Sequence, residues 1–155
     1  MAIGGKHLTN AIPEILYYPA DDAIDQEKSD VDAYFRTRDE RHLAFRPGEQ
    51  PTEFHCAPMT GEQWQEIREY ALIYDRGTGA YTNALSHGAF VRCVTRIDNA
   101  IVDDLGHLGT LPRSRWLSDL PDQARDFVGM MIVNASHYSL CGSEEEVAVD
   151  DDIPK

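Results

Sequence analysis

The sequence predicts an α+β fold that is mainly helical: one compact domain with a small β-hairpin, an extended N-terminal arm and an acidic C-terminal tail. Three observations support this class. A helix start signal stands at Thr60, further apolar runs at helical spacing follow it, and two alternating segments flank a Pro-Gly pair at residues 47–48. With 155 residues, of which 42% are hydrophobic and 26% charged, the chain is long enough for a single domain to bury a core.

Residues 1–28 are expected to form the extended arm. Its apolar segment is bracketed by Pro13 and Pro19, which disfavours a regular helix or a central strand. We expect the apolar side chains of the arm to contact a neighbouring subunit; packing on the arm's own domain is the alternative. These side chains are Ile12, Ile15, Leu16, Tyr17 and Tyr18.

The domain itself is expected over residues 29–142. Ser29 and Asp32 form an S-x-x-D start signal for a short helix. The alternating segments 42–46 and 52–56 are joined by a Pro-Gly turn, which predicts a β-hairpin near 42–56. Because two strands alone are marginally stable, this hairpin must pack on helices or on another subunit.

The clearest local signal lies at the start of the next helix. Thr60 and Gln63 fit a capping box, in which each side chain satisfies an unpaired backbone N–H of the first turn. Met59 and Trp64 occupy the positions of a hydrophobic staple across the same cap. The pattern therefore predicts a helix that begins after Thr60 and continues to about Tyr74.

Two longer helices are expected in the second half of the chain. The first runs from about Ala80 to Ile101, with an apolar stripe of Phe90, Val94, Ile97 and Ile101. Residues 103–110 are typical of a loop, and Trp116 is expected as an exposed aromatic anchor. Pro121 suits the first position of the last helix, which should end near Gly142. This helix is expected to bury Ala124, Phe127, Val128, Met131 and Ala135.

The net charge of −13 argues against nucleic-acid binding, because phosphate recognition depends on Lys and Arg. It favours a basic protein partner, although a well-solvated surface has the same composition. No apolar run approaches the ~20 residues that span a bilayer, and the start does not resemble a signal peptide, so we expect no membrane contact and a cytosolic location. The widely spaced Cys56, Cys93 and Cys141 are expected to be free thiols.

No metal or cofactor site is expected. The segment Asp21-Asp22-x-x-Asp25 matches the pattern that holds magnesium diphosphate in isoprenoid synthases, but the chain offers no second ligand set, so a solvated turn or helix cap is favoured. His55 and Cys56 are adjacent and would point to opposite faces of a strand. His137 and Cys141 are the other close pair, and together these residues do not complete a zinc ligand set.

Catalytic motifs are also missing from the sequence. Ser86-His87 and Ser136-His137 are neighbours along the chain, which does not establish a nucleophile and its base. The chain has no G-x-S-x-G, no P-loop and no G-x-G-x-x-G. We therefore expect a protein without enzymatic activity.

Several segments together resemble small tailed-bacteriophage proteins encoded among virion genes, namely minor head or tail components and tail assembly chaperones. The segments are Ser29-Asp30-x-Asp32-x-Tyr34 through Arg38-Asp39, the run around Pro47-Gly48-Glu49, Arg96-Ile97-Asp98-Asn99, Trp116, Leu120-Pro121 and Asn134-Ala135-Ser136. The resemblance implies a virion component, present in several copies and assembled in the host cytoplasm through contacts with other protein subunits. It implies no catalytic residue.

Two hypotheses of function follow. The first is a structural or assembly protein of a phage particle, and the second is a small cytosolic hydrolase or metal-dependent enzyme that uses His and Asp residues. Under the first, the arm, Trp116 and the acidic tail at 143–155 are the expected partner-binding elements. The tail should be held by Lys or Arg of a neighbour through Glu144, Glu145, Glu146, Asp150, Asp151 and Asp152.

Overall fold

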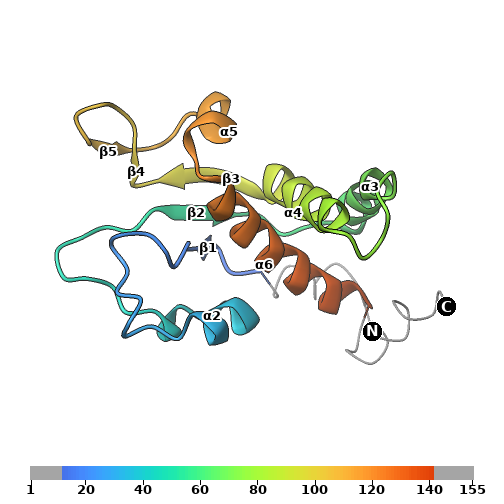
Figure 1. Ribbon diagram of the computed structural model, residues 1–155, viewed down its shortest axis with the longest axis horizontal. Coiled ribbons are helices and arrows are strands. Elements are labelled where there is room, and N and C mark those ends of the chain that lie inside the picture. Colours follow the sequence, from blue (N-terminus) through green and yellow to red (C-terminus); the bar gives the residue numbers. More distant parts are fainter. Residues whose placement is uncertain (1–11, 142–155) are drawn as a thin grey trace.

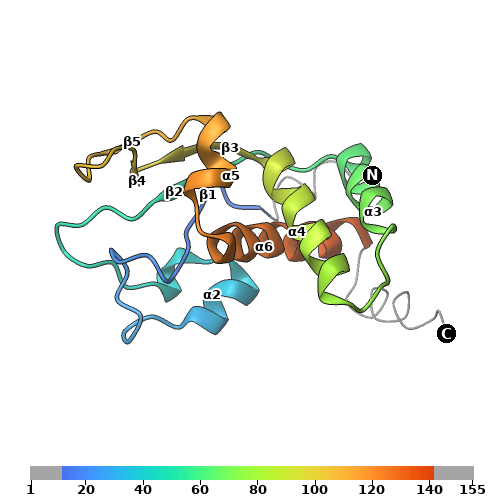
Figure 2. The same cartoon turned by 45° about the horizontal axis from the view of Figure 1, so that its top comes forward.

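The computed structural model describes residues 12–141, with side chains up to residue 136, as one α+β domain (Figures 1 and 2). The helical elements are α2 (Val31–Thr37), η1 (Glu40–His42), α3 (Gly61–Ala71), α4 (Gly79–Cys93), η2 (Arg113–Arg115), α5 (Trp116–Asp119) and α6 (Asp122–Cys141). The strands are β1 (Ile15–Leu16), β2 (Glu53–Cys56), β3 (Val94–Asp98), β4 (Ala100–Ile101) and β5 (Leu108–Gly109). The predicted α+β class is confirmed. Within the described part of the chain, no helix is both long enough and apolar enough to cross a membrane.

The centre of the fold is an antiparallel sheet in the order β1-β2-β3. Leu16 stands opposite Phe54, and Phe54 stands opposite Ile97, so one row of large apolar side chains crosses all three strands. Each of these side chains is buried. The row faces the helices, and Phe54 meets Phe90 of α4 edge to face, with ring centroids 6.0 Å apart. This contact joins the sheet to the helical layer.

The helical layer consists mainly of α4 and α6, which pack against each other (Figure 2). The predicted last helix is confirmed, and Ala124, Val128, Met131 and Ala135 are buried as expected, while Phe127 is half-buried. Phe127 instead contacts Tyr18 and Phe35 edge to face. The predicted stop at Gly142 lies outside the described residues.

The prediction of a hairpin near 42–56 is wrong. Its second strand forms as β2, but the partners of β2 are β1 and β3, and segment 42–46 contributes only an isolated bridge between Phe45 and Ile24. The backbone N–H and C=O groups along both edges of β2 need hydrogen-bond partners, so the strand needs a neighbour on each side. Distant strands supply both neighbours, so the local turn does not determine the pairing.

The helix predicted to reach Ile101 ends at Cys93, and the chain continues directly into β3. A β-bulge explains why the sequence misleads. His55 pairs with Arg96 and Cys56 pairs with Val94, which leaves one extra residue on β3. Because of this extra residue, the buried Val94 and Ile97 stand three apart, as they would in a helix.

Two of the predicted helix starts have different outcomes. The capping box is confirmed: Gln63 N–H donates to Thr60 Oγ1 at 3.1 Å, and Thr60 N–H donates to Gln63 Oε1 at 3.0 Å. The start of α2 is one residue later than the S-x-x-D signal indicates, since Asp30 caps it. The hydroxyl of Ser29 instead donates to the carbonyl of Asp25.

Candidate functional site: an acidic pocket beside an exposed apolar hairpin

The apolar arm residues pack in the chain's own core, which is the alternative that the sequence left open beside contact with a neighbouring subunit. Ile12, Leu16 and Tyr17 are buried, and Ile15 and Tyr18 are partly buried against the same core. The cause is the strand pairing of β1 with β2, supported by a hydrogen bond from Tyr17 N–H to the Tyr34 hydroxyl at 2.8 Å. Residues 1–11 of the arm lie outside the described residues.

Trp116 is also not the exposed anchor that the sequence predicts, because its side chain is only 4% exposed. Its Nε1–H donates to the carbonyl of Leu111 at 3.1 Å, and its ring meets Phe90 edge to face. The guanidinium of Arg113 lies 4.5 Å from the ring centroid. The acidic tail residues Glu144, Glu145, Glu146, Asp150, Asp151 and Asp152 lie outside the described residues.

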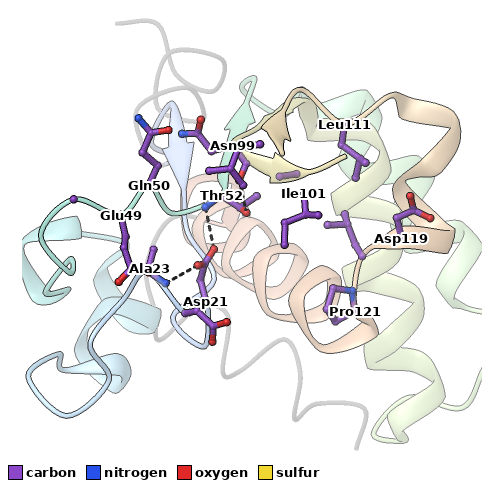
Figure 3. A pocket seen from close by; sticks show the side chains of 15 residues that line it. Asp21, Ala23, Glu49, Gln50, Thr52, Asn99, Ile101, Leu111, Asp119 and Pro121 are labelled. Carbon is purple, nitrogen blue, oxygen red and sulfur yellow. Dashed lines mark hydrogen bonds between the residues drawn. The ribbon is translucent and has the colours of Figure 1, made fainter. Parts of the chain in front are cut away.

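A pocket of about 570 Å³ opens between the turn at residues 21–23, the loop at 48–52, the strands β4 and β5, and the connection from α5 to α6 (Figure 3). Among the described residues that line it there is no Lys, Arg or His. Its acidic side chains are Asp21, Asp22, Glu49 and Asp119, and its apolar side chains are Ala23, Ala100, Ile101, Leu108, Leu111, Leu120 and Pro121. The pocket is therefore amphipathic, with negative charge as its only formal charge.

The four carboxylates differ in how they are held. Asp21 accepts hydrogen bonds from the N–H groups of Ala23 and Thr52, both at 2.9 Å, so it fixes the arm to the start of β2 (Figure 3). Asp119 pairs with Arg115, and its pKa is lowered, first by a hydrogen bond from the Ser118 hydroxyl and then by that guanidinium.

Asp22 and Glu49 provide the pocket's available charge. Neither carboxylate has a hydrogen bond or an ion pair with another described residue. Asp25, the third member of the D-D-x-x-D segment, accepts N–H bonds from Glu27 and Lys28 instead of turning toward the first two aspartates. The turn interpretation of this segment is therefore supported.

Beside the pocket, the hairpin of β4 and β5 projects from the domain (Figure 1). The sequence predicts a helix through Ile101, which is wrong, and a loop at residues 103–110, which is correct except that Leu108 and Gly109 form β5. Ile101 pairs with Leu108 across the hairpin; these side chains are 64% and 48% exposed, and Leu105 in the turn is 82% exposed. Leu117 of α5 is 54% exposed. These four residues, Ile101, Leu105, Leu108 and Leu117, are named the hairpin patch.

Hydrogen bonds within the hairpin and to the neighbouring helical turn hold the hairpin in shape. Asp103 Oδ1 accepts from the N–H groups of Leu105 and His107, and Asp103 Oδ2 lies 2.7 Å from Nδ1 of His107. The bond with His107 is the main reason that the pKa of Asp103 is lowered. Arg115 Nη1 donates to the carbonyl of Val102 at 3.0 Å, which ties β4 to the helical turn. A pre-formed apolar projection has less ordering entropy to lose on binding.

Among the described side chains, Cys56, Cys93 and Ser86 are not activated as nucleophiles. Cys56 and Cys93 are free thiols, and burial raises the pKa of each to about 12. Ser86 is buried, and its hydroxyl contacts the carboxylate of Asp126 at 3.2 Å instead of an imidazole. The side chains of residues 137–141 are outside the described part.

One cluster of metal-binding residue types was missed by the sequence reasoning. Glu53, His55 and Asp98 place one ligand atom each within 4.8 Å of one another. The alternation of Glu53 and His55 around the buried Phe54 is visible in the sequence, but Asp98 joins them only through the pairing of β2 with β3. In the sequence, His55 was considered as a metal ligand together with the adjacent Cys56, whereas in the structure it lies near Glu53 and Asp98.

Comparisons with family models, with curated proteins and with solved structures find no match for this chain.

Proposed function

We propose that this chain is a non-enzymatic structural or assembly protein that acts through protein–protein contacts. The observation that carries the proposal is the amphipathic pocket, whose described lining residues include no basic one and which adjoins the exposed hairpin patch. The partner that fits this surface is a protein segment with both apolar and basic side chains. The resemblance of the sequence to tailed-bacteriophage virion and assembly proteins supplies the setting, a particle built from protein subunits.

A Lys or Arg side chain matches the pocket in both of its parts. Its aliphatic stem would lie along apolar lining such as Leu111 and Pro121, while its charged head would reach Asp22 or Glu49. Hydrogen bonds between a cation and a carboxylate are roughly twice as strong as those between neutral groups. The net charge of −13 would also attract a basic partner from a distance and increase the rate of encounter.

The hairpin patch would supply the apolar share of the contact. Ile101 and Leu108 belong both to the patch and to the pocket lining, so one partner segment can cover both surfaces. Burying apolar area stabilises a complex by roughly 25 cal/mol per Å², and the acidic rim then selects the partner by charge. Leu105 at the tip would contact the partner first.

The proposal can be tested by photocrosslinking in the assembled particle. A photoreactive amino acid at Leu105 or Leu117 is expected to crosslink to one partner protein, at a segment that contains Lys or Arg. The same group at Ile73, which is 71% exposed beyond the end of α3, is the matched control and should not capture that segment. Particles purified from lysed cells should contain the chain as a constant component.

Charge variants separate the pocket from the overall charge. Replacing Asp22 and Glu49 by Asn and Gln should weaken the crosslink from Leu105, whereas Glu62→Gln with Glu69→Gln on α3 removes the same charge and should leave it unchanged. Equal loss in both double variants would mean that only net charge matters. Crosslinks to a different protein in every preparation, or particles without the chain, would contradict the proposal.

A further inference from the structure

The cluster of Glu53, His55 and Asp98 lies on the face of the sheet that points away from the core. Glu53 and His55 alternate with the buried Phe54, so their side chains share the opposite face of β2. Asp98 of β3 stands directly across from Glu53 in the antiparallel register. Two paired strands therefore place three potential ligands on a rigid support. All three residues are partly buried.

Two of the three distances between the candidate ligand atoms are short enough for the atoms to share one ion, and the third pair, Glu53 with Asp98, lies within 4.8 Å. His55 Nε2 lies 3.3 Å from Glu53 Oε1 and 3.1 Å from Asp98 Oδ2. Ligands placed 2.0–2.2 Å from a zinc ion in a tetrahedral or octahedral arrangement stand roughly 2.9–3.5 Å from one another. Both observed distances fall within that interval.

The direction of the imidazole supports the same interpretation. Nε2 is screened from solvent and makes no hydrogen bond, although both carboxylates are close enough to accept one. The carboxylate oxygens therefore lie to the sides of the ring nitrogen's axis and not along it. A metal ion on that axis would contact the nitrogen directly and would also reach the oxygens on either side.

Asp98 is oriented by groups behind it, as metal-binding carboxylates commonly are. Its Oδ1 accepts from the Thr110 hydroxyl at 2.8 Å, and its Oδ2 accepts from Arg96 Nε at 2.8 Å. These bonds lower the pKa of Asp98, the one from Thr110 most of all. The guanidinium occupies one lone pair of Oδ2 and leaves the other for a second partner. Its positive charge also sets an upper limit on affinity for a cation.

We propose that Glu53, His55 and Asp98 bind one divalent transition-metal ion such as Zn²⁺. The imidazole selects for such ions over Mg²⁺ and Ca²⁺, which prefer ligand sets of oxygen only. Three protein ligands leave at least one position for water. The ion would tie β2 to β3 on the outer side of the sheet. This inference rests on residues separate from the pocket and the hairpin patch and goes beyond the proposed binding function.

The test is calorimetric titration of ZnCl₂ into the full chain after removal of metals by EDTA and dialysis. One equivalent is expected to bind, and the melting temperature should rise with zinc concentration. Glu53→Gln should weaken binding at least tenfold while preserving the size of the side chain, and His55→Gln should abolish it. His107→Gln is the matched control, because His107 is also an imidazole beside an aspartate but is exposed and bonded to it.

Absence of binding in the unaltered chain would overturn the proposal, as would binding that survives His55→Gln. Should a variant fail to fold, nitrogen NMR of the unaltered chain decides instead. Addition of ZnCl₂ should shift the Nε2 resonance of His55 before those of His42, His87 and His107. If those other rings respond first and His55 does not change, the cluster is not a metal site.

Discussion

Replacing Gly129 by alanine should destabilise the fold strongly, because α6 meets α4 at this glycine with no space for a side chain. A Cβ atom placed on Gly129 would lie 2.8 Å from the carbonyl carbon of Ser86 and 3.0 Å from its Cα, and closer still to its carbonyl oxygen. These are backbone atoms in the middle of α4, so a rotamer change cannot relieve the overlap. The two helices would have to separate.

The magnitude follows from two opposing effects. Overpacking a well-packed interior costs about 1–3 kcal/mol, while alanine in place of glycine inside a helix returns about 1 kcal/mol through its higher helix propensity. Because the overlap involves backbone, we expect a cost at or above the upper end of that interval and a net loss of about 2 kcal/mol. For a chain of this size that corresponds to a drop of roughly 4–8 °C in melting temperature.

Two other glycines serve as controls. A Cβ on Gly88 would meet side-chain atoms, namely those of Ile67 at 3.1 and 3.2 Å and Arg92 Nη1 at 3.5 Å, and these side chains can shift by a few tenths of an ångström. A Cβ on Gly61 would meet nothing within 4 Å. Urea unfolding followed by circular dichroism should rank Gly61→Ala as the most stable variant, then Gly88→Ala, then Gly129→Ala. Equal stability of the last two would refute the close approach of α4 and α6.

Three further outcomes are expected. Thr60→Ala should lower the free energy of unfolding by about 1 kcal/mol in urea titration, since the first turn of α3 loses its cap, and an unchanged midpoint would contradict the capping role. Burial raises the pKa of Cys56 and Cys93 to about 12, so their contribution to the free energy of unfolding is complete below about pH 9 and declines toward pH 12. Both thiols should react with a thiol reagent at pH 8 only after unfolding. Trp116→Phe should cost about 1–3 kcal/mol by leaving the Leu111 carbonyl unpaired, and melting curves that match those of the unaltered chain would exclude this.

The features predicted correctly from sequence are those that depend on neighbouring residues. A capping box involves two side chains and the backbone between them, so Thr60 and Gln63 reveal the start of α3 without any tertiary information. The last helix has enough periodic apolar positions to be recognised alone. The strand β3 cannot be recognised from its sequence alone, because its bulge gives the buried Val94 and Ile97 the spacing of a helix.

The candidate sites depend on long-range contacts, and the sequence does not reveal these. The pocket combines four separate segments, and its only local sign was the aspartate pair at Asp21 and Asp22. The hairpin patch had a usable signal: apolar Ile101 and Leu108 flank a turn that contains Asp103 and Gly106, whose φ is +82°. The prediction of a long helix through Ile101 hid that signal.

The pocket and the cluster of Glu53, His55 and Asp98 have no residue in common, which makes their independence a testable prediction. Thr52 lines the pocket, whereas His55 points to the other side of β2. Three links join the sites: the peptide bond between Thr52 and Glu53, the left-handed residue Asn99 between β3 and β4, and the bond from Thr110 to Asp98. None of these links passes through His55. His55→Gln should therefore abolish zinc binding and leave the crosslink from the hairpin patch intact. Loss of both would show that the metal positions the hairpin through one of these links.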